Sequence, residues 1–261
     1  MACAECTSGS IHTGTPVGKE ITLGGLQSYV TGDETSQRII VFGTDIFGWR
    51  LPNARILADE YAAKNFWVVV PDLFGGRELP RWTLTATEHT DKPTLKQRLL
   101  RPLLLFLFIP FLFRNTKASQ SDKINGLLTH LRATRPDAKI GMVGFCWGGR
   151  YAITMNSLFD ATVAAHPSLV KFPGEVQEIK KPVSFAVAET DKQFDAKRAD
   201  ETEALLRNRS FNDFEVVVYK GVDHGWTVRT DMTNPEKKAK RDQARDQALN
   251  WFEKYLTVSS T

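Results

Sequence analysis

A glycine-rich turn directly after an apolar run constrains the fold of this chain more than any other feature. Residues 140–143 (Ile-Gly-Met-Val) have the character of a buried strand, and Gly144-Phe145-Cys146-Trp147-Gly148-Gly149 follows them. A side chain presented at a sharp strand-to-helix turn requires small residues two before and two after it, because the backbone there is strained and a neighbouring chain passes close by. Gly144 and Gly148 meet this requirement around Cys146. The pattern predicts a strand, a tight turn that presents a thiol, and a helix.

Cys146 stands where a nucleophile would be activated. The N–H groups and the dipole at the start of the following helix favour a thiolate and an oxyanion. An isolated turn of this kind also fits a buried structural cysteine. Partner residues elsewhere in the chain therefore decide between the two interpretations.

A cysteine nucleophile is activated by a base, which in turn is oriented by a third group. In folds built on such a turn, the acid and then the histidine follow the nucleophile along the chain, each on a loop after a strand. Asp191 follows the apolar run 182–188, and His224 follows the run 214–219. These two residues are the predicted acid and base.

Neighbouring titratable residues leave some alternatives open. Glu189 and Asp195 could replace Asp191 as the acid, whereas Asp223 fits a turn because side chains adjacent in sequence diverge. His166 ends a short strand before a proline and fits a turn or the edge of the site. The remaining histidines, for which structural or solvated roles are expected, are His12, His89 and His130.

Apolar strands alternate with amphipathic helices along the chain. A hairpin is expected around Gly24-Gly25, and helices are expected from about Pro52, across 124–131 and across 244–255. Uninterrupted apolar strands that alternate with helices predict an α/β fold, with a mostly parallel central sheet and helices on both faces. The 261 residues fit one domain spanning 1–261, because no linker of biased composition divides them.

Together these motifs resemble the dienelactone hydrolase family, which includes carboxymethylenebutenolidase, and in particular its fungal branch. The matching segments are 44–49, 71–74, 144–150, 165–168 and 223–226. The resemblance implies an α/β-hydrolase fold and a triad of Cys146, His224 and Asp191. It also implies an oxyanion hole formed by the backbone N–H groups of Ile46 and Trp147.

The resemblance assigns further residues to the site. Family members commonly have a glutamate near the cysteine that helps to control its protonation, and the shorter Asp45 stands at this position; a loop cap is the alternative role. Arg229 roughly matches an arginine that holds the substrate carboxylate in bacterial members. The resemblance does not place a second such arginine, because residues 77–120 depart from the bacterial pattern; Arg77 and Arg81 are the candidates, and surface charge is the alternative for each of these arginines. Trp49 and Trp226, in matching segments, are further substrate-binding candidates.

Residues 99–113 are intensely apolar and fit the fold poorly. A membrane span needs about 20 apolar residues, and this run is shorter and is interrupted by Arg101, Pro102 and Pro110. We expect a lid or a pocket wall within the divergent segment 77–120. Core packing, and a dimer or membrane-surface contact, are the alternatives.

Composition excludes several classes of protein. The net charge of +4 has no accompanying nucleic-acid motif, and the basic run 237–241 is typical of a solvated helix face. The pair Cys3 and Cys6 is weak evidence for zinc, so no metal is expected, and hydrolysis by the triad needs no cofactor. No secretory signal is evident, which indicates a cytoplasmic protein; a homodimer is left open.

The expected function is hydrolysis of a small-molecule ester or lactone through a thioester. Fungal family members often accompany polyketide pathways, so the resemblance also implies a polyketide or other secondary-metabolite substrate. One alternative is a non-hydrolytic step at the same site, such as lactonisation, condensation or dimerisation, in a pocket that excludes water. The other is a catalytically silent binding protein that uses 99–113 as its contact.

Overall fold

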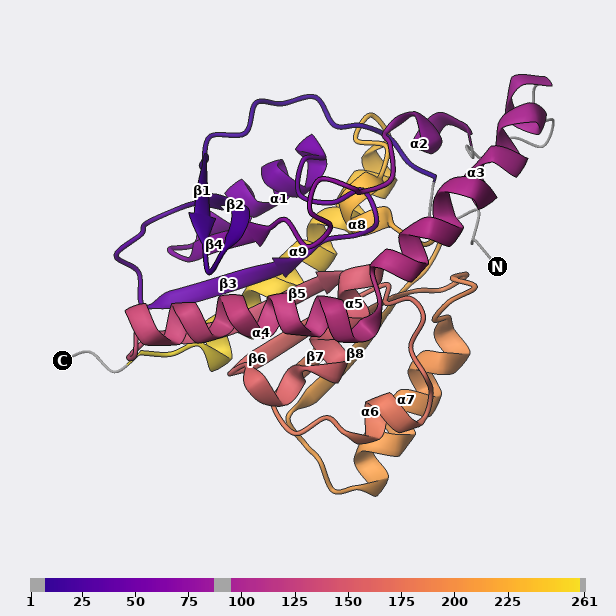
Figure 1. The fold of residues 1–261 in the computed structure, drawn as a ribbon. Helices are drawn as coiled ribbons and strands as arrows, with labels where there is room; N and C mark the ends of the chain where they lie inside the picture. Colours follow the sequence, from indigo (N-terminus) through magenta and orange to yellow (C-terminus); the bar gives the residue numbers. More distant parts are fainter. Residues whose placement is uncertain (1–7, 87–94, 259–261) are drawn as a thin grey trace.

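The fold is built around one twisted sheet that runs through the middle of the molecule (Figure 1). The computed structural model describes residues 8–86 and 95–258. Within them, eight strands form a sheet in the order β1-β2-β4-β3-β5-β6-β7-β8. The strands are β1 (Lys19–Leu23), β2 (Leu26–Thr31), β3 (Arg38–Gly43), β4 (Trp67–Pro71), β5 (Lys139–Phe145), β6 (Ala161–Ala165), β7 (Val183–Ala188) and β8 (Phe214–Tyr219).

The sheet is parallel from β4 to β8, and only the β1–β2 hairpin and its pairing with β4 are antiparallel. Every residue of β4, β6 and β7 is buried. Strands buried on both faces read as continuous apolar runs, which is the pattern seen in the sequence. The predicted α/β fold with a mostly parallel sheet is confirmed.

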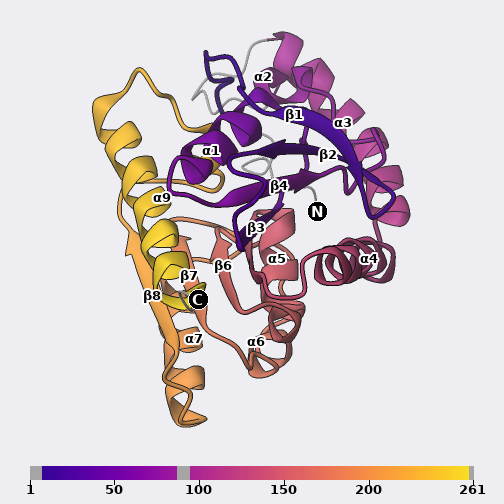
Figure 2. The same cartoon turned by 90° about the vertical axis from the view of Figure 1, so that its left-hand side faces the viewer.

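Helices cover both faces of this sheet. They are α1 (Pro52–Ala62), α2 (Trp82–Ala86), α3 (Leu95–Arg114), α4 (Lys117–Thr134), α5 (Trp147–Thr154), the short 3₁₀ helix η2 (Asn156–Leu158), α6 (Gly174–Gln177), α7 (Ala196–Asn208), α8 (Trp226–Arg229) and α9 (Pro235–Tyr255). In Figure 2, α1 and α9 lie on one side of the sheet, and α4 and α5 lie on the other. Each layer therefore buries one face of the central strands.

The predicted helices appear with the expected buried faces. Ala54, Leu57, Ala58 and Tyr61 of α1 are buried, as are Ile124, Leu127, Leu128 and Leu131 of α4. In α9, Ala244, Ala248 and Trp251 are buried, and Tyr255 packs against the core. The hairpin turns at Gly24 and Gly25, both with positive φ, as expected. Strand boundaries differ from the expected ones by a residue or so.

The apolar segment 99–113 lies within the helix α3, which continues through Pro102 and Pro110. The helices of residues 8–86 and 95–258 include none with the length and apolar character needed to cross a membrane. Cys3, Cys6 and His89 lie outside the described residues.

Candidate active site

Cys146 sits at the tight turn between β5 and α5. Its backbone has φ 52° and ψ −108°, a strained conformation for a residue with a side chain. A Cβ placed on Gly148 would lie 1.9 Å from the carbonyl oxygen of Gly43, and one on Gly144 would lie 2.1 Å from that of Gly148. Both glycines are therefore required by close backbone approach, as the sequence pattern predicts.

The predicted acid and base lie together beside this turn. His224 Nδ1 is 2.7 Å from Asp191 Oδ2, and both side chains are buried. The other carboxylate oxygen of Asp191 accepts a hydrogen bond of 2.8 Å from the Gln193 backbone N–H. Asp191 is thus held in place from two sides, which fixes the orientation of the imidazole.

The charge state of His224 is coupled to Cys146. Burial lowers the pKa of this imidazole, but the negative charges of Cys146 and Asp191 and the hydrogen bond to Asp191 outweigh burial and raise the pKa to about 10. A histidine pKa raised by a neighbouring cysteine is typical of an imidazolium paired with a thiolate.

The alternative acids have other partners. Glu189 accepts a hydrogen bond from the Gly221 N–H at 3.1 Å. Asp195 caps the start of α7 through the Arg198 N–H at 2.9 Å. Asp223 accepts a hydrogen bond from the Thr190 hydroxyl at 3.0 Å, in line with the turn role expected for it.

The site is assembled by the order of the strands. Cys146, Asp191 and His224 follow β5, β7 and β8, and the carboxyl ends of parallel strands lie at one edge of the sheet. Asp45 and Ile46 follow β3, which pairs with β5 up to Gly43 and Gly144. The segments that carry Ile46 and Trp147 therefore leave neighbouring strands side by side.

Two residues after β6 complete the surroundings, and one of them was missed by the sequence analysis. Ser168 Oγ lies 3.6 Å from Cys146 Sγ. Its sequence signals are that it lies in the matching segment 165–168 and that it follows β6, which lies between β5 and β7. His166 is fully buried, its Nε2 lies 2.7 Å from Thr227 Oγ1, and its ring packs edge-on against His224 at a centroid distance of 4.9 Å. Burial, together with the charges of His224 and Arg229, holds the pKa of His166 well below its usual value.

Asp45 forms a buried ion pair with Arg229. Asp45 Oδ2 accepts from Arg229 Nη1, and Asp45 Oδ1 accepts a hydrogen bond of 3.0 Å from the Phe47 N–H. Burial raises the pKa of Asp45, Arg229 opposes this change, and Cys146 adds to it. Asp45 is therefore a loop cap that is also electrostatically linked to Cys146. The alternative of a surface charge at Arg229 is wrong, because its side chain is 1% exposed.

The other predicted substrate contacts fall in different environments. Trp49 is a core residue, 1% exposed, with the guanidinium carbon of Arg55 4.8 Å from its ring centroid. Arg81 is exposed and donates to the carbonyl oxygen of Arg50. Trp226 lines a cavity next to His224, as Arg229 does, whereas Trp49 and Arg81 are not among the residues that line it. Neither Trp49 nor Arg81 is brought against Cys146 by any contact among the described residues.

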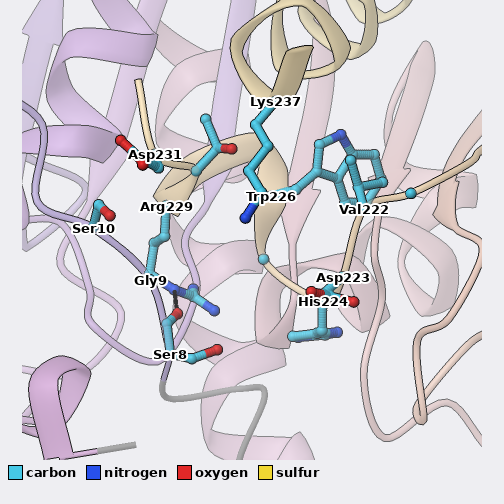
Figure 3. A pocket seen from close by; sticks show the side chains of 13 residues that line it. Ser8, Gly9, Ser10, Val222, Asp223, His224, Trp226, Arg229, Asp231 and Lys237 are labelled. Carbon is cyan, nitrogen blue, oxygen red and sulfur yellow. Dashed lines mark hydrogen bonds between the residues drawn. The ribbon is translucent and has the colours of Figure 1, made fainter. Parts of the chain in front are cut away.

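The cavity next to His224 has a volume of about 260 Å³ and a polar lining (Figure 3). Its walls are the 221–231 segment, the N-terminal residues Ser8, Gly9 and Ser10, and Lys237 at the start of α9. The Lys237 side chain extends into the space between Arg229 and His224 (Figure 3). Arg229 Nε donates to the Ser8 carbonyl at 2.9 Å, so the N-terminal segment is tied to this wall.

An aromatic cluster packs against Trp147, the residue that follows Cys146. Phe111 of α3 lies 5.2 Å from the ring of Trp147 and 5.1 Å from the ring of Phe74. Phe108 stacks on Phe111 at 6.1 Å. One face of α3 thus packs against the residue that follows Cys146.

Within the part of the chain that the structure describes, no three His, Cys, Asp or Glu side chains gather as a metal site. The chemistry available here is that of a thiol, an imidazole and a carboxylate in a buried row, with the start of a helix beside them.

Comparisons with known proteins show what the chain is similar to. The hydrolase tropI of Talaromyces stipitatus is 30% identical over 256 residues, which cover 96% of this chain and 95% of that protein. The carboxymethylenebutenolidase homolog of Homo sapiens is 28% identical, with 92% of each chain covered. A crystal structure of a putative dienelactone hydrolase from Klebsiella pneumoniae superposes with a TM-score of 0.66 at 19% identity, over 92% of this chain and 99% of that one, and supports the α/β-hydrolase fold. The family model for the dienelactone hydrolase family matches residues 26–256, and the chain belongs to that family.

Proposed function

We propose that the protein hydrolyses a carboxylic ester or lactone through Cys146 as a covalent nucleophile. The observation that carries the proposal is the buried row of Cys146, His224 and Asp191, in which His224 Nδ1 lies 2.7 Å from Asp191. Membership of the dienelactone hydrolase family supports a hydrolase. The cysteine mechanism and the substrate class are our inference from the site.

In the first half-reaction, His224 holds the thiol proton and the Cys146 thiolate attacks the carbonyl carbon. The backbone N–H groups of Ile46 and Trp147 stabilise the oxyanion of the tetrahedral intermediate. As this intermediate collapses, the C–O bond breaks and His224 protonates the departing alkoxide. An acyl thioester on Cys146 remains.

In the second half-reaction, water replaces the alcohol. His224, now neutral, takes a proton from the water as it attacks the thioester. Collapse of the second intermediate releases the carboxylic acid and returns the proton to the Cys146–His224 pair. Asp191 keeps Nδ1 of His224 protonated and stabilises the imidazolium in both steps.

The surroundings of the site favour a substrate with an apolar, aromatic part. Phe74, Phe111 and Trp147 provide an apolar wall beside Cys146, and the polar cavity around Lys237 lies on the His224 side. A secondary-metabolite ester or lactone, such as a polyketide product, fits such a two-sided site. Arg229 acts here by holding Asp45 rather than as a freely exposed substrate arginine.

Intact-mass measurement after brief exposure to a chromogenic short-chain ester tests the proposal. We expect an acyl adduct on the wild type that is absent from Cys146→Ala, with turnover lost by about 10³-fold or more in Cys146→Ala and His224→Ala. Asp191→Asn should lose up to about 10⁴-fold. Asp195→Asn is the matched control, because Asp195 caps α7 through the Arg198 N–H and asparagine caps a helix equally well, so this variant should retain most of the activity.

Equal turnover in the wild type and in Cys146→Ala would show that the thiol is not the nucleophile. Incorporation of labelled oxygen from water into the acid product separates hydrolysis from lactonisation or condensation. A product without the label would replace hydrolysis by acyl transfer to another acceptor.

A further inference from the structure

The helix α3 has two faces with opposite surroundings. Phe108 and Phe111 are 9% and 3% exposed and pack toward Phe74 and Trp147. Phe106 and Phe113 are 75% and 79% exposed, and Ile109 is 51% exposed. Positions 106, 109 and 113 follow the helical repeat, so their side chains share one face. The outer face of α3, defined by these three residues, is thus a continuous apolar strip.

Exposure of this apolar strip to water is unfavourable unless another surface binds to it. Single exposed apolar side chains are ordinary on protein surfaces, but neighbouring large ones on one helix mark a contact site. In Figures 1 and 2, α3 runs along the periphery of the molecule, and in Figure 1 its N-terminal half extends past the other elements. The outer face of α3 is therefore accessible to a large, flat partner.

The charge of α3 indicates what that partner is. The 20 residues Leu95–Arg114 include Lys96, Arg98, Arg101 and Arg114 and contain no acidic residue. Apolar helices rich in basic residues bind in the plane of a membrane surface, with the apolar face in the lipid and the charges near anionic headgroups. None of the described helices, α3 included, has the length and apolar character needed to cross a bilayer, so α3 would lie on the membrane surface.

A second copy of the chain fits this face less well. A whole aromatic side chain covers about 150–250 Å², so the three residues offer on the order of 400 Å², whereas a stable interface buries about 800 Å² on each partner. In such a dimer the acidic partners for the basic residues of α3 would have to come from other elements, because α3 itself contains no acidic residue.

We propose that the outer face of α3 is a docking surface for a membrane that contains anionic lipids. The inner face of the same helix packs on Trp147, the residue after Cys146. Docking would hold the site next to the lipid surface, where an apolar ester or lactone is concentrated. The binding itself does not depend on the proposed reaction, and the two can be tested apart.

Co-sedimentation of the full chain with vesicles tests the docking surface. The probes are vesicles of phosphatidylcholine alone and of phosphatidylcholine mixed with phosphatidylglycerol. We expect stronger binding to the mixed vesicles, by about tenfold or more, and a decrease as salt is added, because screening weakens the attraction of the basic helix. The double variant Phe106→Ser/Phe113→Ser should bind at least about tenfold more weakly, since each side chain contributes more than a factor of ten when buried.

Leu158→Ser is the matched control. Leu158 is 40% exposed on η2, so this variant removes an exposed apolar side chain elsewhere and should bind as the wild type does. Circular dichroism and thermal unfolding establish that each variant is folded, and the salt dependence of the wild type tests the charge argument without any variant.

Three results would overturn the proposal. The first is no binding of the wild type to either vesicle, and the second is equal binding by a folded Phe106→Ser/Phe113→Ser variant. The third is a wild-type dimer in light scattering that the same variant converts to a monomer, which would assign the face to self-association. Hydrolysis of a water-soluble ester is measured separately, so that loss of docking and loss of catalysis are distinguished.

Discussion

At the scale of single residues, the site depends on charges that are buried together. Cys146, His224, Asp191, Asp45 and Arg229 are each 3% exposed or less. In such a setting the charge of one group sets the protonation of the next, because water screens little of the interaction. This interaction between buried charges can be tested in two ways, at the Cys146 thiol and at the pair of Asp45 and Arg229.

The first concerns the reactivity of the Cys146 thiol. Since the pKa of His224 is raised to about 10, its imidazolium should persist across neutral pH and stabilise the thiolate. We expect the rate of alkylation by iodoacetamide to change little between about pH 6 and pH 9 in the wild type. In His224→Ala the rate should rise with pH, as for an ordinary thiol with a pKa near about 8.5. The same steep rise in the wild type would contradict a preformed ion pair.

The second concerns the buried pair of Asp45 and Arg229. Asp45→Asn leaves the guanidinium of Arg229 buried beside a neutral amide, so it should lower the free energy of unfolding by about 3–5 kcal/mol. The double variant Asp45→Asn/Arg229→Met removes both charges and should recover part of this loss. Urea unfolding at neutral pH measures both changes. An Asp45→Asn variant as stable as the wild type would show that the ion pair of Asp45 and Arg229 does not stabilise the fold.

At the scale of elements, sequence reasoning succeeded where one local rule decides the outcome. The tight turn at Cys146 follows from its glycines, and the positions of Asp191 and His224 follow from the strands that precede them. The burial of Arg229 does not follow from sequence, because its partner Asp45 is 184 residues away and the pair forms only when the sheet is complete. Ser168, in the matching segment 165–168, was given no role for the same reason: its neighbour Cys146 follows a different strand.

Glu175 of α6 links the helices α4, α5 and α6 near the tight turn at Cys146. Its carboxylate accepts from Arg150 of α5 and from Lys117 of α4, both at distances within 3.2 Å. Burial would raise the pKa of Glu175, but these partners and the Lys171 N–H lower it to about 2. The pairing therefore links three helices on one face of the sheet.

This shift predicts a pH-dependent contribution to stability. A carboxyl group whose pKa is lower in the folded state stabilises the fold above its unfolded pKa of 4.5, and the contribution is lost as the pH falls toward 2. Glu175→Gln should lower the free energy of unfolding by about 2–3 kcal/mol at pH 7, and this difference should shrink below about pH 4. Urea unfolding at several pH values measures it, and a difference that stays constant with pH would contradict the assignment.

At the scale of the whole molecule, the two helical layers share the central strands. Phe252 of α9 is fully buried, and a Cβ on Gly141 of β5 would lie 2.6 Å from its ring. Phe252→Ala should cost about 3–5 kcal/mol, because it opens a cavity between α9 and the sheet. Val258→Ala, at a position 40% exposed, is the control and should change the stability by less than about 0.5 kcal/mol. A small loss for Phe252→Ala in urea unfolding would show that the layer is not closely packed.

The layered architecture was predictable as a whole, whereas the buried face of the segment 99–113 was not. Continuous apolar strands with helices between them leave few arrangements other than a covered parallel sheet. A run that is apolar on every side gives no periodicity from which to choose a buried face. Phe108 and Phe106 look equivalent in the sequence, and only the place of Trp147 and Phe74 in the fold distinguishes them.

The attachment of the N-terminal segment to Arg229 has a practical consequence for how the protein is produced. The Ser10 N–H donates to the Arg229 carbonyl at 2.8 Å, and the Ser8 carbonyl accepts from the same arginine. A purification tag joined ahead of Ser8 would emerge beside the His224 cavity and would crowd or block it. A tag placed after α9 avoids this, since Leu256 just beyond α9 lies beside Gly141, near the end of β5 that is away from Cys146. Assays that compare the two tagged forms should therefore find the C-terminally tagged protein more active, and cleavage of the N-terminal tag should remove the difference.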